Sequence, residues 1–311
     1  MRVLVMAYQD IGWVCLDELL ALGADVAAVV THRDDPREEI WFRSVAGRAR
    51  EAGLPVLEPT TVNDPDVIVE LARLEPDLIL SFYFREILSA KVLDLARHAA
   101  LNLHGSLLPR YRGRCPVNWV LVHGETETGV TLHHMERRAD TGDIVAQRAV
   151  AIDDDDTALT LNRKLGDAAR VLLRATFPRL VDGTAPRVPQ DHARATCFGG
   201  RRPEDGRIVW TATAREVHNL VRAVTHPYPG AFSAWRGERL FVWSAKAVDD
   251  AARGEPGRIL AVAPDGVLVG TGAGALRLEK VQLEGAREEL AGGFANRIGL
   301  AVGDHLGGDG C

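Results

Sequence analysis

Along the first half of the chain, short runs of hydrophobic residues alternate with segments in which hydrophobic residues recur every three or four positions. The first run, residues 2–7, is nearly uninterrupted, which is typical of a strand buried on both faces of a parallel sheet. In the next segment, hydrophobic residues between Val14 and Leu22 recur at helical spacing, and Gly23 marks the end of that helix. This order predicts an open α/β sheet with helices on both faces.

The same alternation continues to about residue 180. Further strands are expected at residues 25–31, 55–57, 77–82, 100–104, 129–135 and 144–152, and further helices at residues 39–52, 67–74, 117–123 and 157–180. The acidic run 153–156 stands just before the last of these helices. Its carboxylates could suggest a metal site, but helix capping at the positive end of the helix dipole explains them better.

The second half of the chain follows a different pattern. Residues 183–205 are rich in Gly, Pro, Arg and Asp and show little periodicity, so we expect a boundary between one domain of residues 1–203 and another of residues 204–311. Beyond it, a helix is predicted at 214–224. Short strands separated by Gly and Pro follow at 240–244, 258–262, 266–270 and 275–281. This pattern predicts a small β-barrel or sandwich.

Charge and composition exclude several classes of protein. The formal net charge is −6, and residues 204–311 hold 12 Lys and Arg against 14 Asp and Glu, which gives a net charge of 12 − 14 = −2. Neither value favours nucleic acid as a partner. The four cysteines form no CxxC pair, which fits neither a disulfide framework nor a zinc site. Without a signal peptide or an apolar stretch of about 20 residues, a cytoplasmic protein with no membrane partner is expected.

A dinucleotide cofactor is also disfavoured. The turn after the first predicted strand reads AYQDIGW, at residues 7–13, where a dinucleotide-binding sheet would carry GxGxxG. Without those glycines the backbone cannot closely approach a pyrophosphate.

The residues that point to a reaction stand at the end of the strand predicted at 100–104. Side chains alternate along a strand, so Asn102 and His104 point to the same side near its carboxyl end, where open α/β sheets bind their ligands. Transfer of a carbonyl group to an amine needs a group that moves a proton and a donor that stabilises an oxyanion. His104 and Asn102 can supply these functions, and Asp140 can orient the imidazole.

Longer motifs surround these residues. They read NLHGSLLPRYRGRCPVNW from residue 102, ETETGVTLHHM from 125 and RADTGDIVAQ from 138, with SFYFRE from 81, ATCFGGRRPED from 195 and HNLVRAVTHPYPGAFS from 218. Together they resemble the 10-formyltetrahydrofolate-dependent formyltransferases, which act on methionyl-tRNA, glycinamide ribonucleotide or amino sugars. The resemblance covers nearly the whole chain and is closest to the formyltransferase half of bifunctional polymyxin-resistance proteins of the ArnA type.

The resemblance implies a Rossmann-like formyltransferase domain followed by a smaller, OB-like β-barrel. It implies that Asn102 stabilises the transition state, His104 carries the proton and Asp140 tunes that histidine. The co-substrate would be 10-formyltetrahydrofolate, with no metal. Its expected contacts are Arg85, Glu86, Ile87, Arg114, Glu136, Arg137, Arg138 and Ala139. Contacts with the acceptor are assigned to Tyr8, Gln9 and Asp10, which follow the first strand, and to Ser106.

The expected acceptor is a nucleotide-linked amino sugar, in the first place UDP-4-amino-4-deoxy-L-arabinose, whose formylation belongs to lipid A modification and polymyxin resistance. Another UDP- or dTDP-amino sugar and methionyl-tRNA stay open as alternatives. A folate-binding or hydrolytic relative is a third possibility, although the intact trio argues against a purely binding role. The sequence also leaves open whether the protein forms a homo-oligomer.

Overall fold

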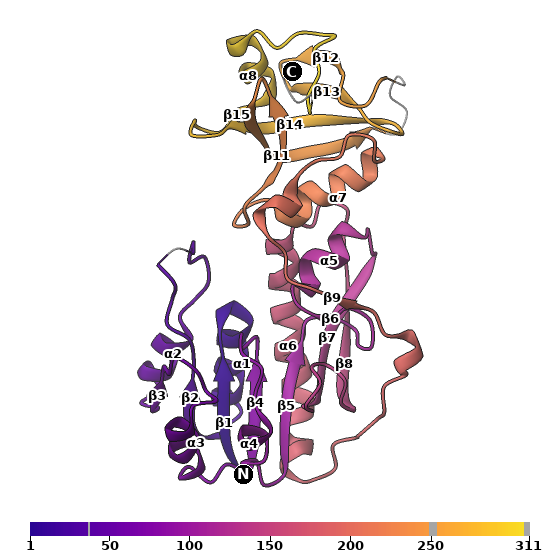
Figure 1. Cartoon of the computed structure of the whole chain (residues 1–311). Helices are drawn as coiled ribbons and strands as arrows, with labels where there is room; N and C mark the ends of the chain where they lie inside the picture. The colour runs from indigo at the N-terminus through magenta and orange to yellow at the C-terminus, as the bar shows by residue number, and fades with distance from the viewer. Residues whose placement is uncertain (37, 249–253, 308–311) are drawn as a thin grey trace. The chain divides into compact units, whose positions relative to one another are not determined.

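The computed structural model describes residues 1–36, 38–248 and 254–307 of the chain, which folds into two compact units (Figure 1). Unit 1 consists of Met1–Pro116, Glu127–Ile152 and Leu161–Gly199, and unit 2 consists of Val117–Thr126, Asp153–Thr160 and Gly200–Cys311. The sequence suggests a single cut between residues 203 and 204. The units instead divide between Gly199 and Gly200, and unit 2 takes up two short segments from earlier in the chain.

Unit 1 is built on a seven-stranded sheet with the strand order β3-β2-β1-β4-β5-β7-β8. The strands are β1 (Arg2–Ala7), β2 (Asp25–Val30), β3 (Val56–Leu57), β4 (Leu78–Phe82), β5 (Ala99–His104), β7 (Glu127–His134) and β8 (Ile144–Ala151). β1 to β5 pair in parallel, whereas β7 runs antiparallel to β5 and β8 antiparallel to β7. The predicted α/β sheet is therefore present, with two antiparallel strands at one edge.

Helices cover both faces of this sheet. The helices are α1 (Gln9–Ala21), α2 (Val45–Glu51), α3 (Pro65–Ala72), α4 (Ala90–Leu93) and α6 (Ala158–Val181). On one face, Leu71 of α3 and Val92 of α4 pack with Leu4 and Met6 of β1 in a fully buried cluster. On the other, α6 lies against α1, where Arg174 donates to the buried carboxylate of Glu18. Among the described residues, the structure has no helix both long and apolar enough to span a membrane.

The helix predicted at 39–52 is shorter than the sequence suggests. It begins at Val45 because the Ser44 side chain accepts a hydrogen bond from the Gly47 amide, which is typical of an N-cap. Before this cap, Arg43 pairs with Asp10 at 2.7 Å, and its guanidinium lies over the Trp13 ring. These tertiary contacts replace the first turns of the predicted helix.

Unit 2 contains an antiparallel sheet with the order β10-β11-β14-β13-β12, and β15 pairs with β14. Its elements are α5 (Pro116–Val122), α7 (Ala214–Val224), β10 (Ala231–Trp235), β11 (Glu238–Val248), β12 (Ile259–Ala263), β13 (Gly266–Gly270), β14 (Ala275–Leu283), β15 (Glu289–Leu290) and α8 (Ala291–Ile298). The pairings between the described strands form an open order, so a closed OB-like barrel stays a prediction. The helix α7 is predicted from the sequence, whereas β10, β15 and α8 are not.

The two early segments of unit 2 are fixed by hydrogen bonds to α7. The Asn118 amide donates to the Ala223 carbonyl at 2.7 Å, and Arg222 donates to the Asp153 carbonyl at 3.0 Å. Within the acidic run, the Asp156 carboxylate accepts from the Asp153 amide and from the Thr160 hydroxyl, both at 2.8 Å. These bonds agree with the interpretation of the run as the turn before a helix.

Residues 183–205, expected to be a domain boundary, pair with strands of unit 1 before the chain enters unit 2. Val188 forms an isolated bridge with Ile144 at the start of β8. Farther along, β9 (Cys197–Phe198) pairs in parallel with β6 (Arg112–Gly113), which stands in the loop after β5. This segment therefore borders the loops that follow β5 and β7.

Candidate active site

The three residues of the predicted catalytic trio lie together in unit 1. Asn102 and His104 stand near the carboxyl end of β5, and Asp140 lies in the loop between β7 and β8. Asp140 Oδ1 is 3.5 Å from Nδ1 of His104 and 3.5 Å from Nε2 of His133. The Asn102 amide nitrogen is 3.3 Å from the same His133 nitrogen. An amide, two imidazoles and a carboxylate thus form one connected cluster.

The orientation of His104 determines which of its nitrogens can take up a proton. Its Nε2 lies 2.7 Å from the carbonyl oxygen of Tyr111. Because a carbonyl oxygen only accepts hydrogen bonds, the hydrogen of the neutral ring belongs on Nε2. Nδ1 then carries the lone pair and faces Asp140. A proton taken up at Nδ1 is therefore stabilised by a neighbouring carboxylate.

Asp140 is held in an unusual backbone conformation and as a carboxylate. Its φ of 57° lies in the left-handed region, which non-glycine residues seldom occupy. Burial alone would raise the pKa of Asp140. The His104 and His133 rings and a 2.9 Å hydrogen bond from the Gly113 amide outweigh this effect and hold the pKa well below its usual range.

His133 also belongs to this cluster, although the sequence alone does not predict it. His133 is 1% exposed and stands on β7 directly opposite Asn102 of β5. Its Nδ1 lies 2.8 Å from the His134 carbonyl and donates to it, whereas its Nε2 lies 3.3 Å from the Asn102 amide nitrogen and 3.5 Å from Asp140 Oδ1. A histidine within a predicted strand is a signal in the sequence, but its partner depends on the register between β5 and β7.

The residues predicted to contact folate fall into two groups. Arg85 pairs with Glu38 at 2.7 Å, and the Glu86 carboxylate accepts from the Val62 amide at 2.9 Å. Ile87 is 71% exposed, which is unusual for a large hydrophobic side chain, and Arg114 is also exposed. The second group, Glu136, Arg137, Arg138 and Ala139, forms the exposed loop that leads to Asp140.

A pocket of about 620 Å³ in unit 1 includes part of the second group. Its polar wall contains Glu136, Arg137 and Arg138, and its apolar wall contains Leu93 of α4 and Met135. Arg85, Glu86, Ile87 and Arg114 do not line this pocket. Its volume is in the range of small-molecule sites.

Three of the four residues assigned to the acceptor already have partners within the chain. The Tyr8 hydroxyl donates to Asp34 at 3.0 Å, and burial together with that carboxylate raises the pKa of Tyr8 to about 12. Asp10 pairs with Arg43, and Gln9 begins α1 with a left-handed φ of 62°. Ser106 is fully buried and donates to the Arg110 carbonyl at 2.7 Å. Their contact with an acceptor stays a prediction.

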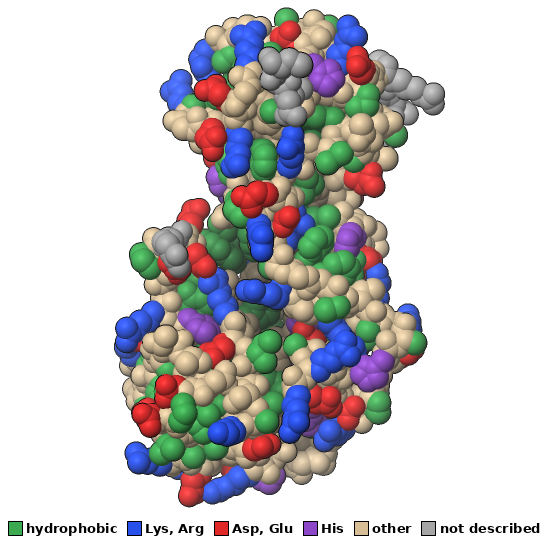
Figure 2. Space-filling model, in the orientation of Figure 1, with side chains coloured by type: hydrophobic (Ala, Val, Ile, Leu, Met, Phe, Trp, Pro, Cys, Tyr) green, Lys and Arg blue, Asp and Glu red, His purple; other side chains and the backbone are tan. Residues whose placement is uncertain are grey.

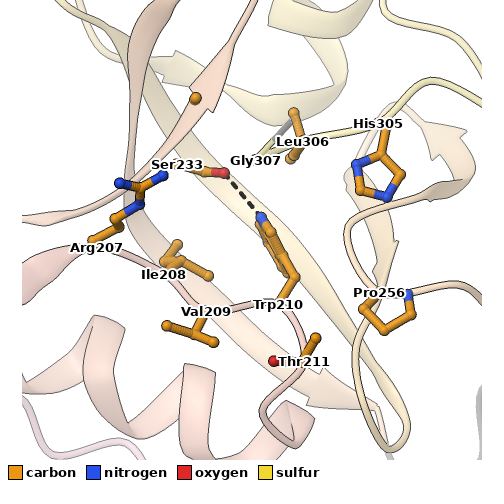
Figure 3. A pocket seen from close by; sticks show the side chains of 11 residues that line it. Arg207, Ile208, Val209, Trp210, Thr211, Ser233, Pro256, His305, Leu306 and Gly307 are labelled. Atoms are coloured by element: carbon orange, nitrogen blue, oxygen red, sulfur yellow. Dashed lines mark hydrogen bonds between the residues drawn. The ribbon is translucent and has the colours of Figure 1, made fainter. Parts of the chain in front are cut away.

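Unit 2 holds a smaller pocket of about 290 Å³, shown in Figure 3. The Trp210 ring forms part of it, and its indole N–H donates to the Ser233 hydroxyl at 2.9 Å, which is the dashed line in the figure. His305 and Pro256 line another side. No predicted site residue lines this pocket. Among the residues with described coordinates, no group of three or more His, Cys, Asp or Glu side chains could hold a metal ion.

Replacement of Gly113 by alanine is expected to affect both stability and activity. Gly113 has a φ of 95°, and an added Cβ would lie 2.2 Å from the Phe198 carbonyl oxygen. Its amide also donates to Asp140. We expect Gly113→Ala to lower the free energy of unfolding by more than the roughly 1–2 kcal/mol that the left-handed conformation alone costs, and to lower kcat about tenfold.

Thermal unfolding and steady-state kinetics check this expectation. Gly53→Ala is the matched control, because Gly53 has a φ of 72° with no atom within 4 Å of the added Cβ. If the two variants lose equal stability and both keep full activity, Gly113 has no special role.

Models of known families match both parts of the chain. The model described as formyl transferase matches residues 7–176, and the model described as formyl transferase, C-terminal domain, matches residues 201–299. The first match alone covers more than half of the chain and includes Asn102, His104 and Asp140.

Solved structures with the same fold are similar to the chain over nearly its whole length. An N-formyltransferase from Helicobacter canadensis, solved with folinic acid and dTDP-3-aminofucose, has a TM-score of 0.72 and 18% identity, over 93% of this chain and 100% of that protein. WlaRD, a sugar 3N-formyl transferase solved in the presence of dTDP and 5-N-formyl-THF, has a TM-score of 0.71 and 17% identity, over 92% and 99% of the two chains. HypX from Aquifex aeolicus, in complex with tetrahydrofolic acid, has a TM-score of 0.66 and 20% identity, and this chain spans only 48% of its length.

Proposed function

Because the chain belongs to the formyl transferase family, we propose that it transfers a formyl group from 10-formyltetrahydrofolate to the amine of a nucleotide-linked amino sugar. The main support is the convergence of Asn102, His104 and Asp140 at the carboxyl end of β5. An amide donor, an imidazole and a carboxylate are the groups that acyl transfer to an amine requires.

The reaction assigns each group a separate role. The amine nitrogen attacks the formyl carbon, the carbonyl oxygen becomes negative, and the bond from that carbon to N10 of the folate breaks. One proton leaves the amine and one joins N10, so the products are an N-formylated sugar and tetrahydrofolate. His104 carries this proton at Nδ1, Asp140 stabilises the charged ring, and the Asn102 amide donates to the oxyanion.

We place the folate against the 620 Å³ pocket, in which Glu136, Arg137 and Arg138 belong to the loop that leads to Asp140. Asn102, His104 and Asp140 do not line this pocket, so the formyl end of the folate must extend beyond it to reach them. A reduced folate combines a flat ring system with an anionic glutamate, and the pocket offers an apolar wall at Leu93 and Met135 together with the cationic Arg137 and Arg138. Arg85, Glu86, Ile87, Arg114, Glu136 and Ala139 complete the proposed contacts.

The proposed acceptor is UDP-4-amino-4-deoxy-L-arabinose, which would assign the enzyme to lipid A modification and polymyxin resistance in the cytoplasm. The motifs around the site support this substrate through their resemblance to the ArnA type. Of two structural neighbours of similar length, one is a sugar 3N-formyl transferase and the other is an N-formyltransferase solved with dTDP-3-aminofucose, so the other UDP- and dTDP-amino sugars belong in the test. Tyr8, Gln9, Asp10 and Ser106 are the proposed contacts with the acceptor.

Charge argues against methionyl-tRNA as the acceptor. Binding to tRNA would require several phosphate contacts, supplied by clustered Lys and Arg. On the face seen in Figure 2, side chains of both signs are interspersed over the surface. The net charge of the whole chain is −6.

A panel of UDP- and dTDP-linked 3-amino and 4-amino sugars, incubated with 10-formyltetrahydrofolate and followed by mass spectrometry, tests the proposal. We expect the mass of one formyl group to be added to UDP-4-amino-4-deoxy-L-arabinose, with equimolar release of tetrahydrofolate. Asn102→Ala is the control and is expected to lose about 100-fold or more in rate. Formylation of methionyl-tRNA, with every sugar left unchanged, would reject the sugar acceptor.

A further inference from the structure

Gln190 lies next to the catalytic cluster, although it belongs to the segment expected to be a domain boundary. Its side chain is 6% exposed. The amide nitrogen donates to the carbonyl oxygens of Asp140, at 3.0 Å, and of Gly142, at 2.7 Å. The proposed reaction does not use Gln190, yet both of these bonds end on the loop that carries Asp140.

The orientation of the Gln190 amide is fixed by a buried arginine. Nη2 of Arg112 donates to Gln190 Oε1 at 2.6 Å and also lies 2.9 Å from Nδ1 of His192. A guanidinium has no acceptor, so the amide oxygen must face Arg112 and the NH₂ group must face the two carbonyls. Arg112 itself is 7% exposed and stands beside Gly113, whose amide donates to the Asp140 carboxylate.

Asp140 needs such support for two reasons. Its left-handed φ of 57° is an unfavourable conformation that persists only where the surrounding structure holds it. Its carboxylate must also stay beside Nδ1 of His104, and a shift of about 1 Å at a reacting centre can cost about 100-fold in rate. The bonds from Gln190 hold the backbone of Asp140, and the bond from Gly113 holds its carboxylate.

We propose that Gln190 is a positioning residue, which holds the Asp140 loop in the conformation needed for proton transfer. The bridge between Val188 and Ile144 fixes the backbone two residues before Gln190 against the start of β8, which directly follows this loop. The inference rests on the proposed function for its kinetic consequence, whereas its structural consequence can be measured without any substrate.

Two variants separate the hydrogen bond between Gln190 and Arg112 from the hydrogen bonds between Gln190 and the Asp140 loop. Gln190→Glu keeps the acceptor for Arg112 but places a carboxylate oxygen opposite the two carbonyls, and Gln190→Leu removes every bond. The matched control is Gln282→Leu in unit 2, where the Gln282 amide donates to the Ala286 carbonyl at 2.7 Å and accepts from the Trp243 indole at 2.8 Å.

The first measurement is hydrogen–deuterium exchange of residues 136–143 in the full chain. Both Gln190 variants are expected to raise exchange in this segment about tenfold, and Gln282→Leu is expected to leave it unchanged. The melting temperature of Gln190→Glu should fall less than that of Gln190→Leu, because Arg112 keeps a partner. Unchanged exchange in residues 136–143 would overturn the inference even if no amino sugar were a substrate.

The second measurement is a double-mutant cycle with the accepted amino sugar. Gln190→Glu is expected to lower kcat about 10-fold to 100-fold and to change each KM less than about threefold. In an Asp140→Asn background the same substitution should cost less than about threefold, since it acts through Asp140. Losses that multiply in full across the two backgrounds, or a kcat within threefold of the parent, would show that Gln190 does not act through Asp140.

Discussion

Replacement of Asp140 by asparagine is expected to lower kcat about 1000-fold, with little change in either KM. The substitution keeps the shape of the side chain but removes the charge beside Nδ1 of His104. The imidazolium formed during proton transfer then has no counter-charge in a buried site, where such an interaction is worth more than in water. Steady-state kinetics at saturating concentrations of both substrates measures the effect.

The pH dependence of stability provides an independent check on Asp140. Because its pKa is lowered, the carboxylate contributes fully to stability above its ordinary value of about 4 and loses that contribution as the pH falls toward the lowered value. The difference in stability between the parent protein and Asp140→Asn should therefore shrink as the pH falls below about 4. Asp182→Asn is the control for the kinetic effect of Asp140→Asn. Asp182 lies at an exposed turn, so this substitution is expected to leave kcat unchanged.

Replacement of His104 by alanine is expected to lower kcat between about 100-fold and 10,000-fold, because it removes the group that moves the proton. Affinity for tetrahydrofolate should change less than about threefold, since His104 does not line the proposed folate pocket. Single-turnover kinetics measures the first quantity and isothermal titration calorimetry the second.

His226→Ala is a suitable control for this substitution, because His226 lies in unit 2 and is half-exposed. Retention of more than a tenth of the parent rate by His104→Ala would exclude His104 as the proton carrier. A parallel loss of folate affinity would instead assign the ring to folate binding.

Strong local patterns allowed several elements to be predicted to the residue. β1 and α7 have the predicted bounds, the first because its hydrophobic run is unbroken and the second because Thr213 and Glu216 form a capping box. The helix expected at 39–52 loses its first turns because Arg43 and its neighbours contact residues far away in the sequence. Local propensity contains no information on such contacts.

The distinction between local patterns and long-range contacts also applies to the candidate active site. Asn102 and His104 could be placed together from the alternation of a single strand, and Asp140 from the motif around it. His133 depends on the register of β7 against β5, and Gln190 depends on the return of a segment that has no periodic pattern. Neither of these pairings between distant segments can be predicted from the local sequence.

Unit 2 is assembled from three separate segments of the chain, which limits how parts of the protein could be exchanged between relatives. Arg222 of α7 relies on a carbonyl from the 153–160 segment, and Ala223 relies on an amide from the 117–126 segment. A hybrid enzyme joined only at residue 203 would combine these acceptors and donors from two different ancestors. Recombination between family members is thus constrained at three places in the gene rather than at one.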